Sequence, residues 1–283
     1  MNIQPDSFSS SKLQQRIHKI LDVEFQKNEK SDALRLLLSV IDLTTLEGSD
    51  TNERIQDLCI KAKNFHKFGH GISNVAAVCV YPTFVKLAKA ELSNSGVVVA
   101  SVAGAFPSGQ SPISIKLAEI KYAVDQGAEE IDMVISRGLF LEGRHEEVFN
   151  EIAAIRKVTK GIHLKVILET GELVTPGNIR LASEMAIQAG ADFIKTSTGK
   201  ITPAATEEAV LVMIDVIKEY YSLTGKMIGL KPAGGISEPD QALRYFRLMQ
   251  HELGKEWLNK NYFRLGASRL ADKIVKLLLE ENA

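Results

Sequence analysis

Short runs rich in β-branched residues alternate along the chain with longer stretches whose apolar residues recur at helical spacing. The β-rich runs are eight, at residues 38–45, 74–81, 96–104, 129–136, 163–170, 192–199, 227–235 and 262–268. Amphipathic stretches separate them, and one of these ends at Gly190, a residue type that commonly follows a helix C-terminus. Eight successive strand–helix units predict a (β/α)8 TIM barrel of the α/β class rather than an open sheet.

Residues 1–37 lie outside this repeat. The segments "SKLQQRIHKILDVEF" and "SDALRLLLSV" predict two short helices, joined by the polar "QKNEKSD". We expect this N-terminal helical extension to form a lid over the N-terminal end of the barrel, and an oligomer contact is the less favoured alternative. Residues 38–283 then form one (β/α)8 barrel domain that carries the site.

Composition narrows the class of protein. Hydrophobic residues make up 45% of the 283 residues, which is enough for one large core, and the net charge of −1 gives no reason to expect nucleic acid or an anionic membrane as partner. Two cysteines, Cys59 and Cys79, are too few for a disulfide framework and are not spaced as zinc ligands. With no apolar run of about 18 residues and no secretory signal pattern, we expect a cytoplasmic location.

Charged residues interrupt five of the predicted strands on the face opposite their apolar neighbours. Because side chains alternate along a strand, these charges should converge inside the barrel; they are Asp42, Asp132, Lys165, Lys195 and Lys231. An isolated buried charge costs roughly several kcal/mol, and a barrel needs none for its stability. The two explanations are a self-neutralising ion-pair network and a reactive centre.

A reactive centre would use one of the lysines. A lysine that is desolvated beside a second ammonium group loses its proton more easily, and its pKa can fall from roughly 10.4 toward about 7–8. Its neutral amine can then attack a carbonyl to form a Schiff base, while an aspartate moves protons. Spacing alone leaves open whether Lys165, Lys195 or Lys231 is the nucleophile.

Glycines lie at the ends of the last three predicted strands. They allow close approach of the backbone to an anion, and phosphate sites in barrels often form from the loops after strands seven and eight. We therefore predict a phosphate-binding site with Lys200 as its charged contact; its other members are Gly199, Gly234, Gly235, Gly266 and Ser268. For any single glycine, an ordinary turn is the alternative. Cys79 lies near the predicted barrel mouth, where it could face substrate, although a small buried hydrophobic role is favoured.

Six motifs together resemble those of the deoxyribose-phosphate aldolases, class I aldolases built on a barrel. They are "DLTTL", "VCVYP", "EIDMVI", "LKVILETG", "DFIKTSTGK" and "GLKPAGGI", and the similarity runs in order from residue 38 to about residue 280. The resemblance implies that Lys195 forms the Schiff base, that Lys231 lowers its pKa, and that Asp132 moves protons with Asp42 as polar partner. Thr44, Leu46, Thr198 and Lys200 would line the sugar.

The remaining positions divide into matches and departures. The glycines after the sixth and seventh predicted strands and Ser268 match the family's phosphate contacts, whereas Lys165 has no catalytic role in the pattern and is expected beside Glu169 as a structural charge. Arg269 departs from the pattern, because many members carry serine or threonine there. It would either add a phosphate contact or point to solvent.

The activity that the resemblance implies is reversible cleavage of 2-deoxy-D-ribose 5-phosphate to acetaldehyde and D-glyceraldehyde 3-phosphate, a lyase reaction without metal or cofactor. The expected partners are thus a phosphorylated sugar and acetaldehyde, and a homo-oligomer is compatible with the sequence. Two alternatives remain at this point. One is another Schiff-base barrel aldolase with a different phosphorylated substrate, and the other is a non-catalytic sugar-phosphate binder.

Overall fold

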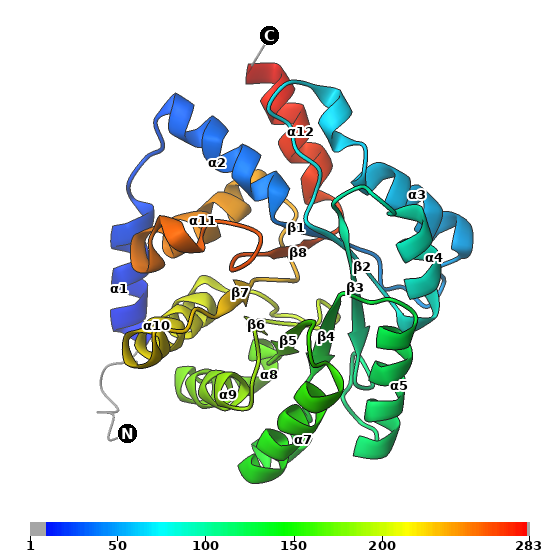
Figure 1. Ribbon diagram of the computed structural model, residues 1–283. Coiled ribbons are helices and arrows are strands. Elements are labelled where there is room, and N and C mark those ends of the chain that lie inside the picture. Colours follow the sequence, from blue (N-terminus) through cyan, green and yellow to red (C-terminus); the bar gives the residue numbers. More distant parts are fainter. Residues whose placement is uncertain (1–9, 282–283) are drawn as a thin grey trace.

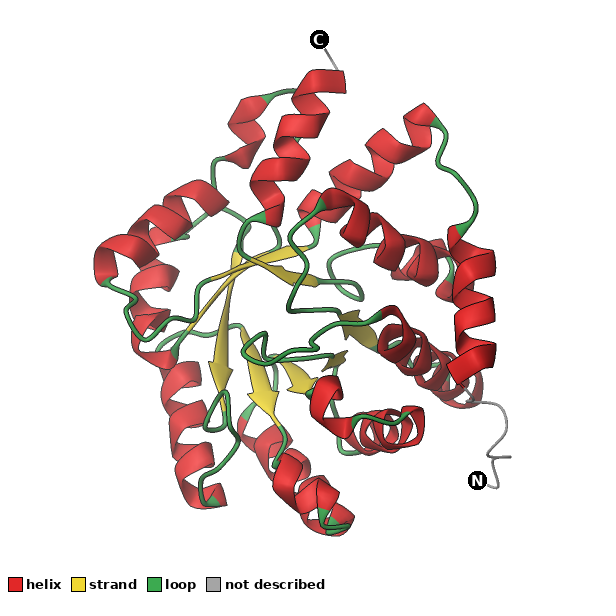
Figure 2. Ribbon diagram, turned by 180° about the vertical axis from the view of Figure 1, so that it is seen from behind, coloured by secondary structure: helices red, strands yellow, loops and turns green. Residues whose placement is uncertain are grey.

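Eight parallel strands stand at the centre of the molecule, with helices around them (Figure 1, Figure 2). The computed structural model describes residues 10–281. The strands are β1 (Ile41–Thr44), β2 (Ala77–Val80), β3 (Val98–Ala103), β4 (Glu130–Val134), β5 (His163–Ile167), β6 (Phe193–Lys195), β7 (Gly229–Lys231) and β8 (Leu265–Ala267). They are hydrogen-bonded in the order β7-β6-β5-β4-β3-β2-β1-β8, and isolated parallel bridges at Leu230–Phe263 and Ala233–Gly266 link the two ends.

This arrangement confirms the predicted (β/α)8 barrel. Every strand lies inside the range predicted for it and is shorter than that range, because the predicted runs included loop residues at the strand ends. The helices between and after the strands are α3 (Asn52–Ala62), α4 (Val85–Glu91), α5 (Ile113–Asp125), α6 (Arg137–Leu141), α7 (His145–Val158), α8 (Thr170–Leu173), α9 (Pro176–Gln188), α10 (Glu207–Thr224), α11 (Pro239–Leu253) and α12 (Leu270–Glu281). Within residues 10–281, short 3-10 helices lie at Phe65–Phe68, Pro82–Phe84 and Lys255–Trp257.

Threonine caps begin three of these helices. The hydroxyl oxygens of Thr51, Thr175 and Thr206 each accept a hydrogen bond from the backbone N–H three residues later, at the start of α3, α9 and α10. Such a cap satisfies one of the N–H groups that have no partner within the helix. The caps fix the residue at which each of these helices begins. They therefore also fix the length of the loop that precedes the helix.

The two faces of the strands differ in polarity. Outward residues such as Ile41, Leu43 and Ile131 are fully buried against the surrounding helices. Inside the barrel lies a separate apolar cluster, whose fully or largely buried members are Leu46, Ala77, Cys79, Ala100, Val102, Phe106, Val134 and Ile167. Half of these residues lie on β2 and β3, and the interior charged residues lie on or next to the other strands.

The extension forms α1 (Ser10–Leu21) and α2 (Lys27–Ser39), which pack beside the outer helices (Figure 1). The α1 helix contacts α10 and α11, where Arg16 forms ion pairs with Asp215 at 2.8 Å and Glu252 at 3.0 Å. The α2 helix contacts α11 and α12 and is joined to α11 by the ion pair of Arg247 with Glu29 at 2.8 Å.

The predicted lid is therefore wrong in its position. The opening at the N-terminal end of the strands, about 200 Å³ in volume, is lined by residues such as Glu129, Glu130, His163 and Arg264, and by none of residues 10–39. The rim of this opening is charged, whereas the buried face of α2 is apolar. The helix therefore packs on the apolar surfaces of α11 and α12 and not over the opening. The predicted linker "QKNEKSD" is also wrong in its position. All of it after Gln26 belongs to α2, which begins at Lys27. The domain boundary at residue 37 stays a prediction.

Between residues 10 and 281, the structure contains no helix that combines the length and the apolar character required to cross a membrane.

The packing of α2 predicts that the extension is needed for stability. Leu37 is fully buried between α2 and the core, so Leu37→Ala should lower the free energy of unfolding by about 2–5 kcal/mol through lost burial and the cavity left behind. Asn28→Ala, an exposed position on the same helix, should change it by less than about 0.5 kcal/mol. Equal values for the two variants in urea unfolding would contradict an integral role for α2.

Candidate active site

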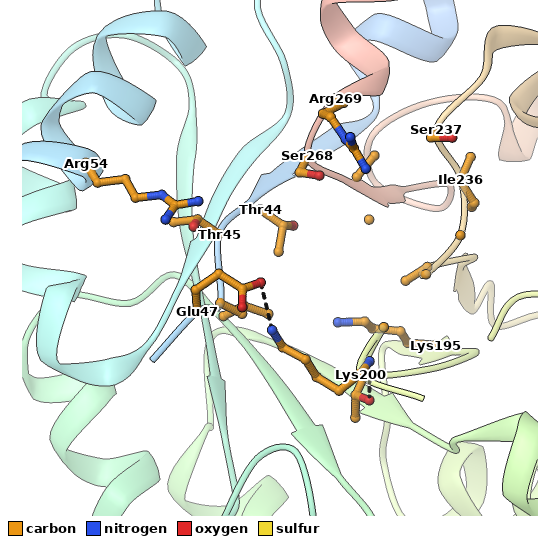
Figure 3. A pocket seen from close by; sticks show the side chains of 18 residues that line it. Thr44, Thr45, Glu47, Arg54, Lys195, Lys200, Ile236, Ser237, Ser268 and Arg269 are labelled. Atoms are coloured by element: carbon orange, nitrogen blue, oxygen red, sulfur yellow. Dashed lines mark hydrogen bonds and ion pairs between the residues drawn. The ribbon is translucent and has the colours of Figure 1, made fainter. Parts of the chain in front are cut away.

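A pocket of about 410 Å³ opens at the C-terminal ends of the strands. The loops after β1, β6, β7 and β8 line it, and Lys195 at the end of β6 lies at its floor (Figure 3). Active sites of TIM barrels lie at this end, because the loops that follow the strands converge there.

The structure brings most of the predicted site residues together in this pocket. Its lining includes Thr44, Leu46, Lys195, Thr198, Gly199, Lys200, Gly234, Gly235, Gly266 and Ser268. Asp42, Asp132 and Lys231 are fully buried beneath it. Cys79 is also fully buried and is the one predicted substrate contact that does not line the pocket; burial raises the pKa of its thiol to about 11.

Lys195 is held by one carboxylate. Its side chain is almost fully buried, and Nζ donates a hydrogen bond to Asp132 Oδ2 at 2.8 Å. Burial lowers the pKa of Lys195; the carboxylate of Asp132 opposes this shift, and the ammonium group of Lys231 adds to it. The net result is a pKa below that of an ordinary lysine.

The other two lysines have the opposite shift. Lys231 Nζ donates to Asp132 Oδ2 at 2.7 Å and also to Asp42. Lys165 Nζ donates to Glu130 Oε2 at 2.5 Å and to Asp132 Oδ1 at 2.9 Å. Burial alone would lower the pKa of each lysine, but in each case the carboxylates outweigh burial and raise it. Among the three buried lysines of the barrel interior, only Lys195 is thus shifted toward the neutral amine.

Two charged residues of the interior were missed by the sequence analysis. Arg264 donates to Asp42 Oδ1 at 2.6 Å and to Glu130 Oε1 at 2.7 Å, and both Arg264 and Glu130 are buried. The period of two residues along a strand could have found them, because Glu130 lies two residues before Asp132 and Arg264 lies two residues before Gly266.

Within the described residues, this network joins four lysine and arginine side chains to three carboxylates, and His163 contacts one of these, Glu130, from the half-exposed edge at 3.4 Å. The cations are Lys165, Lys195, Lys231 and Arg264, and the carboxylates are Asp42, Glu130 and Asp132. The charges balance when Lys195 is neutral. Since an uncompensated charge is costly in a poorly solvated interior, charge balance and the direction of the pKa shift favour the same protonation state.

The prediction that Lys165 lies beside Glu169 is wrong. Strand β5 ends at Ile167, and Glu169 has a left-handed backbone with φ of 59°, so the alternation of side chains does not extend to it. Glu169 instead accepts hydrogen bonds from the backbone N–H of Thr198 at 3.1 Å and from its hydroxyl at 2.5 Å. Arg137 donates to the same carboxylate at 2.9 Å. Glu169 therefore fixes the loop after β6, and Lys165 belongs to the network below.

Three of the four predicted phosphate-binding glycines differ in what a Cβ would meet. A Cβ at Gly234 would lie 2.6 Å from Cβ of Ala204, and one at Gly266 would lie 2.7 Å from Cβ of Ala233, so packing alone requires glycine at both positions. Gly235 has φ of +77° and no heavy atom within 4 Å of the position a Cβ would occupy. Its backbone borders open space in the pocket, which is the geometry expected where a ligand approaches the main chain.

No group of three or more histidine, cysteine, aspartate or glutamate side chains is placed to hold a metal ion within residues 10–281.

Comparisons with known proteins give matches along most of the chain. Residues 36–255 match the family model described as DeoC/LacD family aldolase. The human protein named deoxyribose-phosphate aldolase is 46% identical over 250 residues, which cover 84% of this chain and 78% of the human one. The mouse protein of the same name is 45% identical over 248 residues, with the same coverage of 84% and 78%.

A solved structure extends the agreement to the fold. The deoxyribose phosphate aldolase from Aeropyrum pernix, described as having a unique tetrameric structure, superimposes with a TM-score of 0.69 and 26% sequence identity. The match covers 95% of this chain and 97% of that chain. Because the family model spans most of the sequence and the relatives match along most of their length, the chain belongs to the DeoC/LacD aldolase family.

Proposed function

We propose that this protein catalyses the reversible cleavage of 2-deoxy-D-ribose 5-phosphate to acetaldehyde and D-glyceraldehyde 3-phosphate. The observation that carries the proposal is Lys195, whose amine lies at the floor of a pocket, has a lowered pKa and is 2.8 Å from Asp132. Membership of an aldolase family and two mammalian relatives named for this activity support the choice of reaction.

The first step is formation of a Schiff base. The neutral amine of Lys195 attacks C1 of the open-chain sugar, and a C–N bond forms as the carbonyl oxygen takes up a proton. Loss of that oxygen as water leaves a cationic imine. Asp132 and Lys231 lie within hydrogen-bond distance of each other at 2.7 Å, and one of Asp132's oxygens also accepts from Lys195, so the pair can exchange protons with this nitrogen directly or through water.

The second step breaks the C2–C3 bond, because the acetaldehyde product carries two carbons. The bonding electrons move into the imine to give an enamine, and the C3 hydroxyl loses its proton as it becomes the aldehyde of D-glyceraldehyde 3-phosphate. Protonation of the enamine at C2 and hydrolysis of the imine release acetaldehyde and restore Lys195. Asp132 accepts the proton of the C3 hydroxyl. The ammonium group of Lys231, held by Asp132 and Asp42, supplies the proton that is added to C2 of the enamine.

The remaining roles follow from position in the pocket. We assign Thr44, Leu46, Thr198 and Lys200 to the sugar, and Asp42 to holding Lys231. The phosphate group is assigned to Gly199, Gly234, Gly235, Gly266 and Ser268. A cytoplasmic location and a homo-oligomer belong to the same proposal. The free thiols of Cys59 and Cys79 support the first, and the tetramer described for the Aeropyrum relative supports the second.

Reduction with borohydride tests the Schiff base. Incubation with acetaldehyde and borohydride should add one ethyl group to the chain, and peptide mapping should place it on Lys195. Lys195→Ala should abolish the adduct, whereas Lys226→Ala, at an exposed lysine outside the pocket, should leave it unchanged. An unmutated chain that forms no adduct, or one modified at another lysine, would remove the proposed mechanism. Release of D-glyceraldehyde 3-phosphate from 2-deoxy-D-ribose 5-phosphate separates this aldolase from one with a different substrate.

The charge on Lys231 should set the pH dependence. Lys231→Leu removes a cation that lowers the pKa of Lys195. The carboxylate of Asp132, which raises that pKa, is then no longer shared with Lys231. Since the deprotonated amine is the nucleophile, the acidic limb of the kcat/KM profile should move to higher pH. The rate below that limb should fall about tenfold for each unit by which the pKa rises.

Lys231→Arg is the matched variant, because it keeps the positive charge and loses the ability to transfer a proton. Its acidic limb should stay in place while kcat falls. A Lys231→Leu profile that superimposes on that of the unmutated enzyme would show that Lys231 does not depress the pKa of Lys195.

A further inference from the structure

The lysine and arginine side chains of the pocket differ in whether they have a carboxylate partner. Lys200 is paired with Glu47 at 2.8 Å, Arg54 is paired with Asp50 at 3.3 Å, and Lys195 is held by Asp132. Arg269 lines the same pocket, is exposed, and has no carboxylate partner within residues 10–281. Its guanidinium group is therefore the one cation of the described lining that is left for an external anion.

Arg269 is placed at the rim opposite the reactive amine. It follows Ser268 in the short turn between β8 and α12, and Figure 3 shows its side chain directed into the pocket next to Ser268, with Lys195 across the open space. Gly235, whose backbone borders that open space, lies in the loop after β7, and Figure 3 shows the next two residues, Ile236 and Ser237, on the same side of the pocket as Arg269. A substrate whose carbonyl reaches Lys195 would direct its far end toward this turn.

The charge of the lining also favours an anion. Apart from Lys195, the lining contains three cationic side chains, Arg54, Lys200 and Arg269, and one carboxylate, Glu47. Lys200 and Arg54 would have to give up or share existing ion pairs to bind a ligand, whereas Arg269 would not. A guanidinium group presents paired N–H donors that match two oxygens of a phosphate, and such charge-assisted hydrogen bonds are among the stronger ones.

We propose that Arg269 is a specificity-determining residue that binds the terminal phosphate of the substrate and thereby selects phosphorylated over unphosphorylated deoxy-sugars. The inference rests on the proposed function for its substrate, but it adds a residue at which the aldolase motifs predict serine or threonine. Binding through Arg269 holds the phosphate end of the chain and leaves the chemistry at Lys195 unchanged. The effect should therefore fall on KM rather than on kcat.

The test compares 2-deoxy-D-ribose 5-phosphate with unphosphorylated 2-deoxy-D-ribose. For the phosphorylated sugar, Arg269→Met should raise KM about tenfold or more with kcat changed less than about twofold, as expected for a lost charge-assisted hydrogen bond. For the free sugar, kcat/KM should stay the same. Arg269→Lys, which keeps the charge without the paired donors, should give an intermediate KM.

Lys276→Met is the matched control, since it removes one exposed cation from the same helix, α12, outside the pocket. It should leave both substrates unaffected, which separates a contact from a general change of charge. Equal losses on both sugars in Arg269→Met, or no loss on either, would overturn the proposal.

A binding measurement keeps the inference separable from the proposed function. Inorganic phosphate should raise the melting temperature of the unmutated protein, and this rise should be lost in Arg269→Met and retained in Lys276→Met. If the unmutated protein fails to cleave 2-deoxy-D-ribose 5-phosphate, the proposed function fails, and this shift still decides whether Arg269 binds phosphate. The same shift in the unmutated protein and in Arg269→Met, or no shift in either, would overturn the inference.

Discussion

The carboxylate of Asp132 is the interaction on which the rest of the site depends. Its two oxygens accept hydrogen bonds from the Nζ groups of Lys165, Lys195 and Lys231. One carboxylate cannot balance the charges of Lys165, Lys231 and Arg264 in a poorly solvated barrel, so Asp42 and Glu130 supply two further negative charges. Arg264 joins those two carboxylates from below. The lysine with the fewest carboxylate partners, Lys195, is the one whose pKa is lowered.

This arrangement links fold stability to chemistry. A buried ion-pair network is weak evidence for stability in itself, because desolvation offsets much of the attraction between its members. Here the network has a different consequence, since its cations exceed its carboxylates by one and the balance favours a neutral amine at the pocket floor. The apolar cluster of the interior, half of whose buried members lie on β2 and β3, leaves the charges to the remaining strands and keeps them close together.

Much of this could be predicted from the sequence, for identifiable reasons. The alternation of strands and helices is a local signal, and the period of two along each strand placed Lys195, Lys231 and Asp132 inside the barrel. The same period could have found Glu130 and Arg264, which lie one step further from the strand C-termini. Glu169 could not be placed in this way, because a left-handed residue beyond the end of β5 breaks the alternation. The position of α1 and α2 depends on which surface their apolar faces meet, and a single sequence does not specify that surface.

The pKa of Lys195 is the quantity that tests this account most directly. NMR titration of the lysine Nζ groups, with Lys195 assigned through the Lys195→Ala variant, would measure it in the folded protein without substrate. We predict that Lys195 titrates below the ordinary lysine value of roughly 10.4, whereas Lys165 and Lys231 stay charged beyond it. A Lys195 that keeps its proton as long as the other two lysines would contradict the central claim.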